Sequence, residues 1–455
     1  MVAPAAALDP TVQEWVEDIT GGHVVGVRRM DRWRPNFLVD VDGPGGELPL
    51  FLKGPRVPPR VEVRSRMLSG YGTRREAVAL AALQDTAVAV PHFHGYLHEA
   101  RALLIGRVPG TGVLQPAPDG ERADLMRQYG QQLAATHGLD PAQLGARPGL
   151  AVSDDAAGPA RPGPLAAIMA DYDVLRPKLE RPDPLVELAS WWLSRNAPTD
   201  RELCVLHGDA GPNQFMFEGG RITALVDWEL AHLGHPMSDL GYTRFRESLY
   251  PSGGFAAFVE AYAAASGRPV DRRAVDYFTV VAGLVMLVGA SSDVHRPTAR
   301  NPEALQRFWW DALARVAICQ VLGETLGHPP LLVHAVEQHP GELTGLSSLL
   351  TGMQDPAEPA HLLARTLLRA SRLQPDVVDT AELLGRHVAD PYAEIVALVA
   401  DRPGERLDEL VSYFGRQALR RMDAMAPLAA TDTWDGAETA AEHTRFDRPL
   451  LPAFD

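Results

Sequence analysis

Two acidic residues stand at the ends of neighbouring apolar runs in VLHGDAGPNQFMFEGGRITALVDWE, residues 205–229. The run LCVL leads into a His-Gly-Asp motif ending at Asp209, where Gly and Pro then prevent a continuing strand or helix. The runs QFMF and ITALV, joined by Gly-Gly, predict a hairpin that returns Asp227 to the same end. We therefore expect Asp209 and Asp227 to face one cleft, with the carboxamides of Asn213 and Gln214 between them.

The chemistry of these side chains favours a hard cation. Carboxylate and carboxamide oxygens suit Mg²⁺ better than zinc. Phosphoryl transfer needs such charge neutralisation together with an acid that orients the attacking hydroxyl. Aspartates that merely cap turns are a common alternative, but Asp239 in the following GHPMSDL adds a third acid to the same turn-rich region. The pattern therefore favours phosphoryl transfer.

The order and spacing of these motifs resemble the aminoglycoside/choline-kinase-type phosphotransferases. The resemblance rests on HGDAGPNQFMF and ALVDWELAHLGHPMSDLGY, and it covers roughly residues 20–325. The chain is particularly similar to the kinase-like domains related to those fused to acyl-CoA dehydrogenases. The resemblance implies an α+β, two-lobed protein-kinase-like fold, with a β-rich N-terminal lobe and a mainly helical C-terminal lobe. It also implies the use of ATP and Mg²⁺ and a small-molecule hydroxyl as acceptor.

The same resemblance gives roles to individual residues. Asp209 would be the base that accepts the proton of the acceptor hydroxyl, and His207 would brace the catalytic loop. Asp227 would hold Mg²⁺ against the ATP phosphates. Asp239 would be a structural acid that ties the loop down.

The chain departs from the family pattern at the second metal ligand. The family normally carries Asn five residues after the catalytic Asp, but this position is Gln214, preceded by Asn213. Either carboxamide is therefore a candidate metal ligand. The substitution also motivates an alternative function, a catalytically impaired, pseudokinase-like nucleotide-binding regulatory module.

A kinase-like lobe also requires a Lys–Glu pair that positions the ATP phosphates. Lys53 ends the strand-like run PLFLK, and Glu76 opens the next helical run. This order and spacing match the pair. A lone Lys after an apolar strand is more often a solvated strand end, so the interpretation depends on Glu76 and the downstream motifs.

Other nucleotide contacts are expected on either side of this pair. The stretch RRMDRWRPNFLVDV lacks the glycines of a phosphate-covering loop. Asn36 nevertheless matches the family's usual Asn, and Arg32 and Arg34 could supply charge instead. The run ALLIGRVPG matches the hinge strand, where the backbone at Gly106 and Val108 would contact adenine.

The elements that must position these residues change in character along the chain. Short strand-like runs (HVVGV, NFLVDVDG, LPLFLKG) precede a helix at about 74–83, and long apolar helices are expected at 274–292 and 303–325. The Gly/Pro/Ala-rich segment 152–164 predicts a loop. The runs AHLLARTLLRAS and ERLDELVSYFGRQALRR are amphipathic. We expect a nucleotide-binding lobe over 1–108, a catalytic lobe over 109–332, and a small helical domain over 333–455 with a loose tail from about 429.

Composition narrows the class of protein. The chain has 455 residues and a formal net charge of −15, which argues against a general nucleic-acid surface. Two cysteines outside any metal-ligand spacing indicate a reducing compartment. The N-terminus lacks the basic region of a signal peptide, and the longest apolar run, Tyr277–Ala290, is too short to span a membrane. We therefore expect a cytoplasmic enzyme.

Several properties stay open at this level. Aminoglycosides, hydroxyacyl thioesters, choline-like alcohols and sugars all remain candidate acceptors. Dimerisation, an acyl-carrier partner and simple stabilisation all fit the C-terminal helices. His92, His94 and His98 invite a metal-site interpretation, but no nearby acid or Cys completes a ligand set. No Gly-x-Ser-x-Gly or Walker motif supports a hydrolase or P-loop assignment.

Overall fold

A five-stranded antiparallel sheet forms the N-terminal lobe in the computed structural model. Its strands are β1 (His23–Met30), β2 (Asn36–Gly43), β3 (Gly46–Lys53), β4 (Phe93–Leu97) and β5 (Ala102–Gly106), in the order β1-β2-β3-β5-β4. The structure describes residues 7–30, 35–54, 72–114, 116–141, 164–178, 182–200, 202–295, 304–333, 377–386, 388–425 and 448–454. Arg32, Arg34, nearly all of the predicted loop 152–164 and the run AHLLARTLLRAS lie outside these residues.

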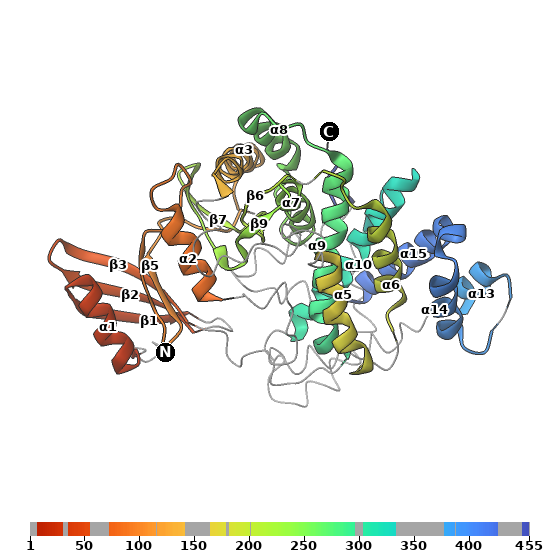
Figure 1. The fold of residues 1–455 in the computed structure, drawn as a ribbon, viewed down its shortest axis with the longest axis horizontal. Coiled ribbons are helices and arrows are strands. Elements are labelled where there is room, and N and C mark those ends of the chain that lie inside the picture. The colour runs from red at the N-terminus through yellow and green to blue at the C-terminus, as the bar shows by residue number, and fades with distance from the viewer. Residues whose placement is uncertain are drawn as a thin grey trace, which may run out of the picture.

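The two faces of the sheet pack against different helices because successive strand residues point to opposite sides. Leu50, Leu52 and Leu104 share a core with α1 (Pro10–Thr20). Leu103 and Ile105 instead pack in the larger core that contains α2 (Thr73–Leu83). Figure 1 shows α1 and α2 beside this sheet. The β2–β3 register places Asn36 opposite Lys53, so two of the predicted nucleotide-binding residues are neighbours.

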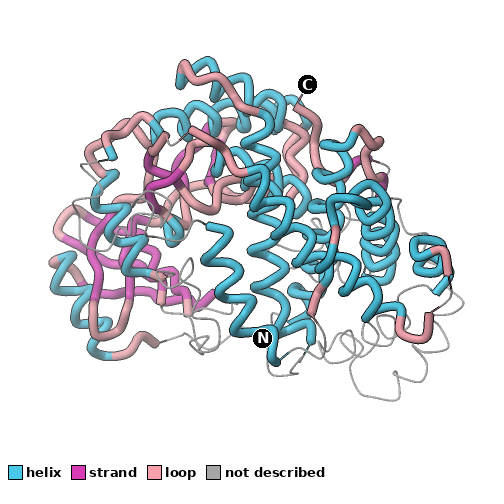
Figure 2. Tube along the Cα trace, turned by 45° about the vertical axis from the view of Figure 1, so that its right-hand side comes forward, coloured by secondary structure: helices cyan, strands magenta, loops and turns pink. Residues whose placement is uncertain are grey.

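The described residues that follow the sheet are mainly helical (Figures 1 and 2). Its helices are α3 (Asp119–His137), α5 (Pro164–Leu175), α6 (Pro184–Asn196), α7 (Met237–Leu249), α8 (Phe255–Ser266), α9 (Arg272–His295) and α10 (Ala304–Leu326). Two short antiparallel pairs interrupt them, β6 (Cys204–Leu206) with β9 (His232–Gly234) and β7 (Phe215–Glu218) with β8 (Arg221–Leu225). The predicted hairpin is confirmed, and its turn at Gly219 and Gly220 has φ values of 56° and 73°. The α+β, kinase-like arrangement expected from the sequence is therefore confirmed.

Helix α9 is long and apolar enough to cross a membrane by length and composition alone. Its window Arg272–Ala290 has a mean hydropathy of 1.5, but 78% of the window is buried inside the protein. Its main neighbours are α7 and α10. The helix is therefore a core helix, as the sequence indicated for the apolar run within it.

The C-terminal helices share their core with the preceding lobe. They are α13 (Val377–Leu384), α14 (Pro391–Asp401) and α15 (Leu407–Met425). Leu410, Val411 and Phe414 of the predicted amphipathic face are buried in the same cluster as Ile318 of α10, and Arg421 is paired with Asp311 at 2.6 Å. Figure 1 shows α13–α15 at the end of the molecule opposite the sheet. The domain boundaries at 108 and 332 remain predictions.

The last described residues differ from the loose tail expected there. A short strand β11 (Arg448–Pro449) pairs with β10 (Leu332–Val333), and Leu451 is fully buried. Gln320 accepts a hydrogen bond from the Leu451 N–H at 3.1 Å and donates to its carbonyl at 3.2 Å. No local periodic pattern indicates these contacts, because Gln320 and Leu451 are 131 positions apart. The part of the expected tail before residue 448 lies outside the described residues.

This anchoring predicts a measurable cost for truncating the side chain. Leu451→Ala is expected to lower the free energy of unfolding by about 2–5 kcal/mol, the range for a fully buried leucine. Urea denaturation measures the change. Val25→Ala, at a side chain that is 65% exposed, is the control and is expected to stay within about 0.5 kcal/mol of wild type. Equal effects of the two substitutions would contradict the packed C-terminus.

Candidate active site

The His-Gly-Asp motif leaves β6 in a turn that requires glycine. Gly208 has a φ of 83°, and a Cβ atom built there would lie 2.2 Å from the carbonyl oxygen of Leu230. Glycine alone accepts both the left-handed backbone and this close approach without strain. The turn brings the loop that carries Asp209 against the loop that follows Asp227.

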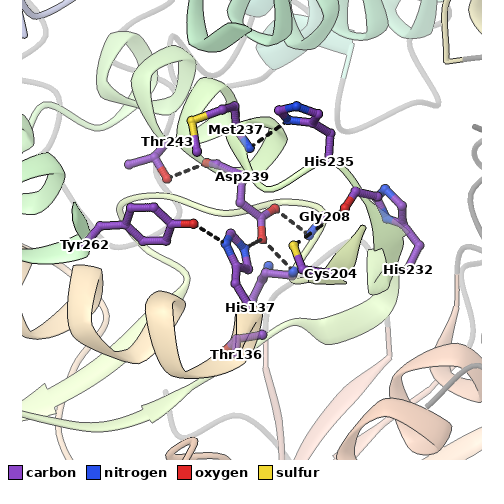
Figure 3. Close-up of polar contacts among 12 residues, drawn as sticks. Thr136, His137, Cys204, Gly208, His232, His235, Met237, Asp239, Thr243 and Tyr262 are labelled. Carbon is purple, nitrogen blue, oxygen red and sulfur yellow. Dashed lines mark hydrogen bonds and ion pairs between the residues drawn. The ribbon is translucent and has the colours of Figure 1, made fainter. Parts of the chain in front are cut away.

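A single buried carboxylate holds the backbone of this turn. Asp239, in the first turn of α7, accepts hydrogen bonds from the N–H of His207 (2.7 Å) and of Gly208 (2.9 Å). His137 Nε2 lies 3.1 Å from the same carboxylate, and its Nδ1 lies 2.8 Å from the Tyr262 hydroxyl (Figure 3). Burial raises the pKa of Asp239, but His137, together with His207 and the Gly208 N–H, outweighs this effect and holds the pKa below its usual value. Asp239 is therefore ionised, and His137 Nε2 is the donor.

His207 joins the two acidic loops. Its Nε2 lies 2.9 Å from the carbonyl oxygen of Val226, the residue before Asp227. A carbonyl oxygen only accepts, so Nε2 carries the proton. The ring is fully buried and lies 4.7 Å, between ring centroids, from Trp228. The imidazole of His207 therefore connects the loop that carries Asp209 to the loop that carries Asp227.

Asp209 faces two side-chain donors. Gln214 Nε2 donates to Asp209 Oδ2 at 2.5 Å. Arg246 Nη1 lies 3.0 Å from Oδ1 and 3.1 Å from Oδ2. Burial raises the pKa of Asp209, and the charge of Arg246 opposes this change without cancelling it. The carboxylate is held on both oxygens.

Lys53 lies between two carboxylates from different parts of the chain. Its Nζ is 2.5 Å from Glu76 Oε2 and 2.5 Å from Asp227 Oδ1. Burial raises the pKa of Glu76 to about 7, against the lowering effect of Lys53 and with further raising by Asp227 and Glu229. Asp227 has a φ of 65°, which is uncommon for a residue other than glycine and marks a constrained position. The predicted Lys–Glu pair and the predicted metal-binding acid therefore meet.

One further acid joins this group. Carboxylate oxygens of Glu76, Asp227 and Glu229 lie within 4.8 Å of one another. Glu229 is the last residue of the Asp-Trp-Glu motif, and sequence reasoning did not assign it a role. The Asp-Trp-Glu motif could have indicated this role, because a residue two positions after an acid at a sharp turn can lie beside that acid.

The two neighbouring carboxamides have different surroundings. Gln214 points its amino group at Asp209, as described above. Asn213 Oδ1 is buried and has no hydrogen-bond partner among the described residues, and its backbone has a φ of 67°. Asn36 Oδ1 is likewise buried and without such a partner. Of the two carboxamides, it is therefore Asn213 whose side-chain oxygen is buried without a partner among the described residues.

The predicted hinge lies at the other end of the β3–β5 pair from Lys53. Gly106 pairs with Leu50 and Lys53 pairs with Leu103. The Gly106 N–H donates to the carbonyl of His92 at 2.8 Å, and Val108 follows two residues after the end of β5. The hinge residues and Lys53 are therefore brought to opposite ends of one strand pair rather than into direct contact.

Three further residues that support the loop were missed from the sequence. Tyr129 of α3 accepts a hydrogen bond from the Gly211 N–H at 2.9 Å, and it is fully buried. His137 supports Asp239, and Arg246 faces Asp209. Tyr129 and His137 are both buried residues of α3, and a helical pattern in the sequence does not show what a buried polar group contacts.

The chain is similar to known proteins over part of its length. Acyl-CoA dehydrogenase family member 11 of Rattus norvegicus is 42% identical over 62 residues, which are 13% of this chain and 8% of that protein. The corresponding protein of Mus musculus is 39% identical over 62 residues, again 13% of this chain and 8% of that protein. The match thus spans a small part of these relatives' length.

Solved structures resemble the chain over a longer stretch. A protein of Ralstonia eutropha described as an aminoglycoside phosphotransferase has a TM-score of 0.50 at 19% identity, over 67% of this chain and 94% of that chain. Macrolide 2'-phosphotransferase MphH of Brachybacterium faecium has a TM-score of 0.46 at 22% identity, over 67% and 97%. The sequence profile of the phosphotransferase enzyme family matches residues 34–278, more than half of the chain. The protein belongs to the phosphotransferase enzyme family.

Proposed function

We propose that the protein transfers the γ-phosphoryl group of ATP to a hydroxyl group of a small molecule, with Mg²⁺ and with Asp209 as the base. The observation that carries the proposal is the position of Lys53, 2.5 Å from both Glu76 and Asp227. This contact joins the end of a strand in the N-terminal sheet to the loop beside Asp209. A fixed cation and a group of acids next to a separate carboxylate suit phosphoryl transfer.

The side chains present fit a divalent cation of the Mg²⁺ type. Asp227, Glu229 and the orphaned carbonyl of Asn213 offer only oxygen atoms, which hard cations prefer. These residues would hold the ion, whose contribution is to neutralise charge on the phosphate oxygens. Lys53, positioned by Glu76, would bind the phosphates.

Asp209 would act at the acceptor. Its carboxylate is fixed by hydrogen bonds on both oxygens, so it is preorganised to accept a proton from a hydroxyl placed beside it. His207 keeps this loop in register with Asp227 through the Val226 carbonyl. Gln214 would then serve Asp209 rather than the metal.

ADP release across a panel of hydroxyl compounds tests the function. Asp209→Asn is expected to lower acceptor-dependent turnover by about 10²–10⁴-fold, the usual contribution of a general base, while ATP binding measured by calorimetry is retained. If nucleotide binds and no compound gives Asp209-dependent turnover, the alternative of a nucleotide-binding regulatory module replaces the enzyme.

Substitutions can distinguish the roles of the two carboxamide side chains, Asn213 and Gln214. Gln214→Asn shortens the side chain, so the hydrogen bond to Asp209 is lost; kcat is expected to fall about tenfold, as the loss of one charge-assisted hydrogen bond predicts. Asn213→Gly removes the orphaned carbonyl and keeps the positive φ without strain. This variant is expected to need a higher Mg²⁺ concentration for half-maximal ADP release.

The Mg²⁺ titration of each variant distinguishes these roles. A raised Mg²⁺ requirement in Gln214→Asn, together with an unchanged requirement in Asn213→Gly, would reverse the assignment. A large gain of activity in Gln214→Asn would instead mark position 214 as an impairment of the site.

A further inference from the structure

The positive charge that lies against Asp209 comes from a helix outside the catalytic loop. The segment HGDAGPNQ, residues 207–214, contains no Lys or Arg, yet the guanidinium of Arg246 from α7 lies against Asp209. We propose that Arg246 is a positioning residue that fixes the Asp209 carboxylate and the following turn at Pro212 in one arrangement for reaction. This proposal rests on the proposed function, because it concerns the base of that reaction.

The hydrogen bonds of Arg246 reach both ends of the turn. Nη1 contacts the two oxygens of Asp209 at 3.0 and 3.1 Å. Nε and Nη2 donate to the carbonyl of Pro212 at 3.3 and 3.2 Å. The planar guanidinium therefore spans the turn with several donors in a fixed geometry, which an ammonium group cannot reproduce.

The aliphatic part of Arg246 fills the space beneath the turn. A Cβ atom built on Gly211 would lie 2.7 Å from Arg246 Cβ and 2.8 Å from its Cδ. Gly211 also has a φ of 145°. The loop and the helix therefore interlock, and the arginine cannot move far while the turn keeps this conformation.

One face of helix α7 forms hydrogen bonds to both halves of the catalytic loop. Asp239 binds the N–H groups of His207 and Gly208, and Arg246 binds Asp209 and Pro212. Residues seven apart lie on the same side of an α-helix, two turns from each other. The helix thus acts as a rigid support along the whole length of the loop, and Arg246 is the part of it that touches the base.

Turnover of variants tests the positioning role. Arg246→Ala is expected to lower kcat by about 10²-fold, the cost of a misplaced catalytic group, with the KM for ATP unchanged. Arg246→Lys is expected to recover only part of the loss. Millimolar guanidinium chloride is expected to raise kcat of Arg246→Ala severalfold, because the ion can occupy the vacated position.

Leu249→Ala is the matched control, since Leu249 is a buried apolar residue one turn further along α7. It loosens the helix without removing a charge, and guanidinium is expected to leave its kcat unchanged. Equal losses of kcat in Arg246→Ala and Leu249→Ala, with no rescue of either, would overturn the positioning role.

A second measurement is independent of turnover. In urea unfolding, Arg246→Ala and Asp209→Ala are expected to be non-additive, whereas Arg406→Ala, beside α15, is expected to be additive with Asp209→Ala. Additive effects of the Arg246 and Asp209 substitutions would overturn the proposal even if the wild type is active. If the wild type releases no ADP with any compound, the proposed function fails, and this unfolding cycle still decides whether Arg246 holds Asp209.

Discussion

Asp239→Asn is expected to abolish acceptor-dependent ADP release and to lower the free energy of unfolding by about 3–5 kcal/mol, because several buried donors lose their charged acceptor. The carboxylate is fully buried and accepts from the N–H groups of His207 and Gly208 and from His137. A carboxamide has one acceptor oxygen, so its amino group would face another donor. The catalytic loop would lose its support, and His137 would lose its carboxylate partner while keeping its contact with Tyr262.

Urea unfolding of wild type and Asp239→Asn checks this expectation. The pKa of Asp239 is lowered in the folded protein, so its contribution is present above the unfolded pKa and is lost as the pH falls through the folded pKa. The difference between the two proteins is therefore expected to shrink under strongly acidic conditions. Asp200→Asn, at an acid that pairs with His235 and is 57% exposed, is the control and is expected to change stability by less than about 1 kcal/mol. A stable, active Asp239→Asn protein would contradict the account.

Lys53→Met is expected to lower kcat/KM by about 10²–10³-fold, as the removal of a preorganised electrostatic contact does in other enzymes. The side chain is 10% exposed and contacts Glu76 and Asp227. Its loss removes the cation that would bind the phosphates. It also leaves Glu76 buried without that cation, although a pKa already near 7 allows this acid to become neutral by taking up a proton.

A second substitution separates activity from stability. Glu76→Gln in the Lys53→Met background removes the buried charge and is expected to recover stability in urea unfolding without recovering ADP release. A double variant that regained activity together with stability would show that Lys53 has only a structural role.

The fold could be predicted from the sequence where local pattern decides the structure. The helices near 74–83, 274–292 and 303–325 and the hairpin at Gly219-Gly220 were visible because apolar spacing and turn chemistry act over a few residues. The packing of Leu451 against Gln320 was not visible, because it joins residues 131 positions apart and leaves no periodic signal.

In the candidate site, too, some features could be predicted from the sequence and others could not. The order of Asp209, Asp227, Lys53 and Glu76 was evident from their motifs, and the structure brings Lys53, Glu76 and Asp227 into contact. The orientation of Gln214 toward Asp209 depended on side-chain geometry that spacing does not determine. Arg246 was missed because a lone arginine within a helical segment has no local feature that indicates its partner.

Transfer of label from ATP labelled in its γ-phosphoryl group tests the central claim most directly. With an acceptor identified by ADP release, the wild-type protein is expected to give a labelled acceptor, and Asp209→Asn is expected to give at least about 10²-fold less. Label that appears only in inorganic phosphate, or equal labelling of the acceptor by both proteins, would contradict phosphoryl transfer to a hydroxyl with Asp209 as the base.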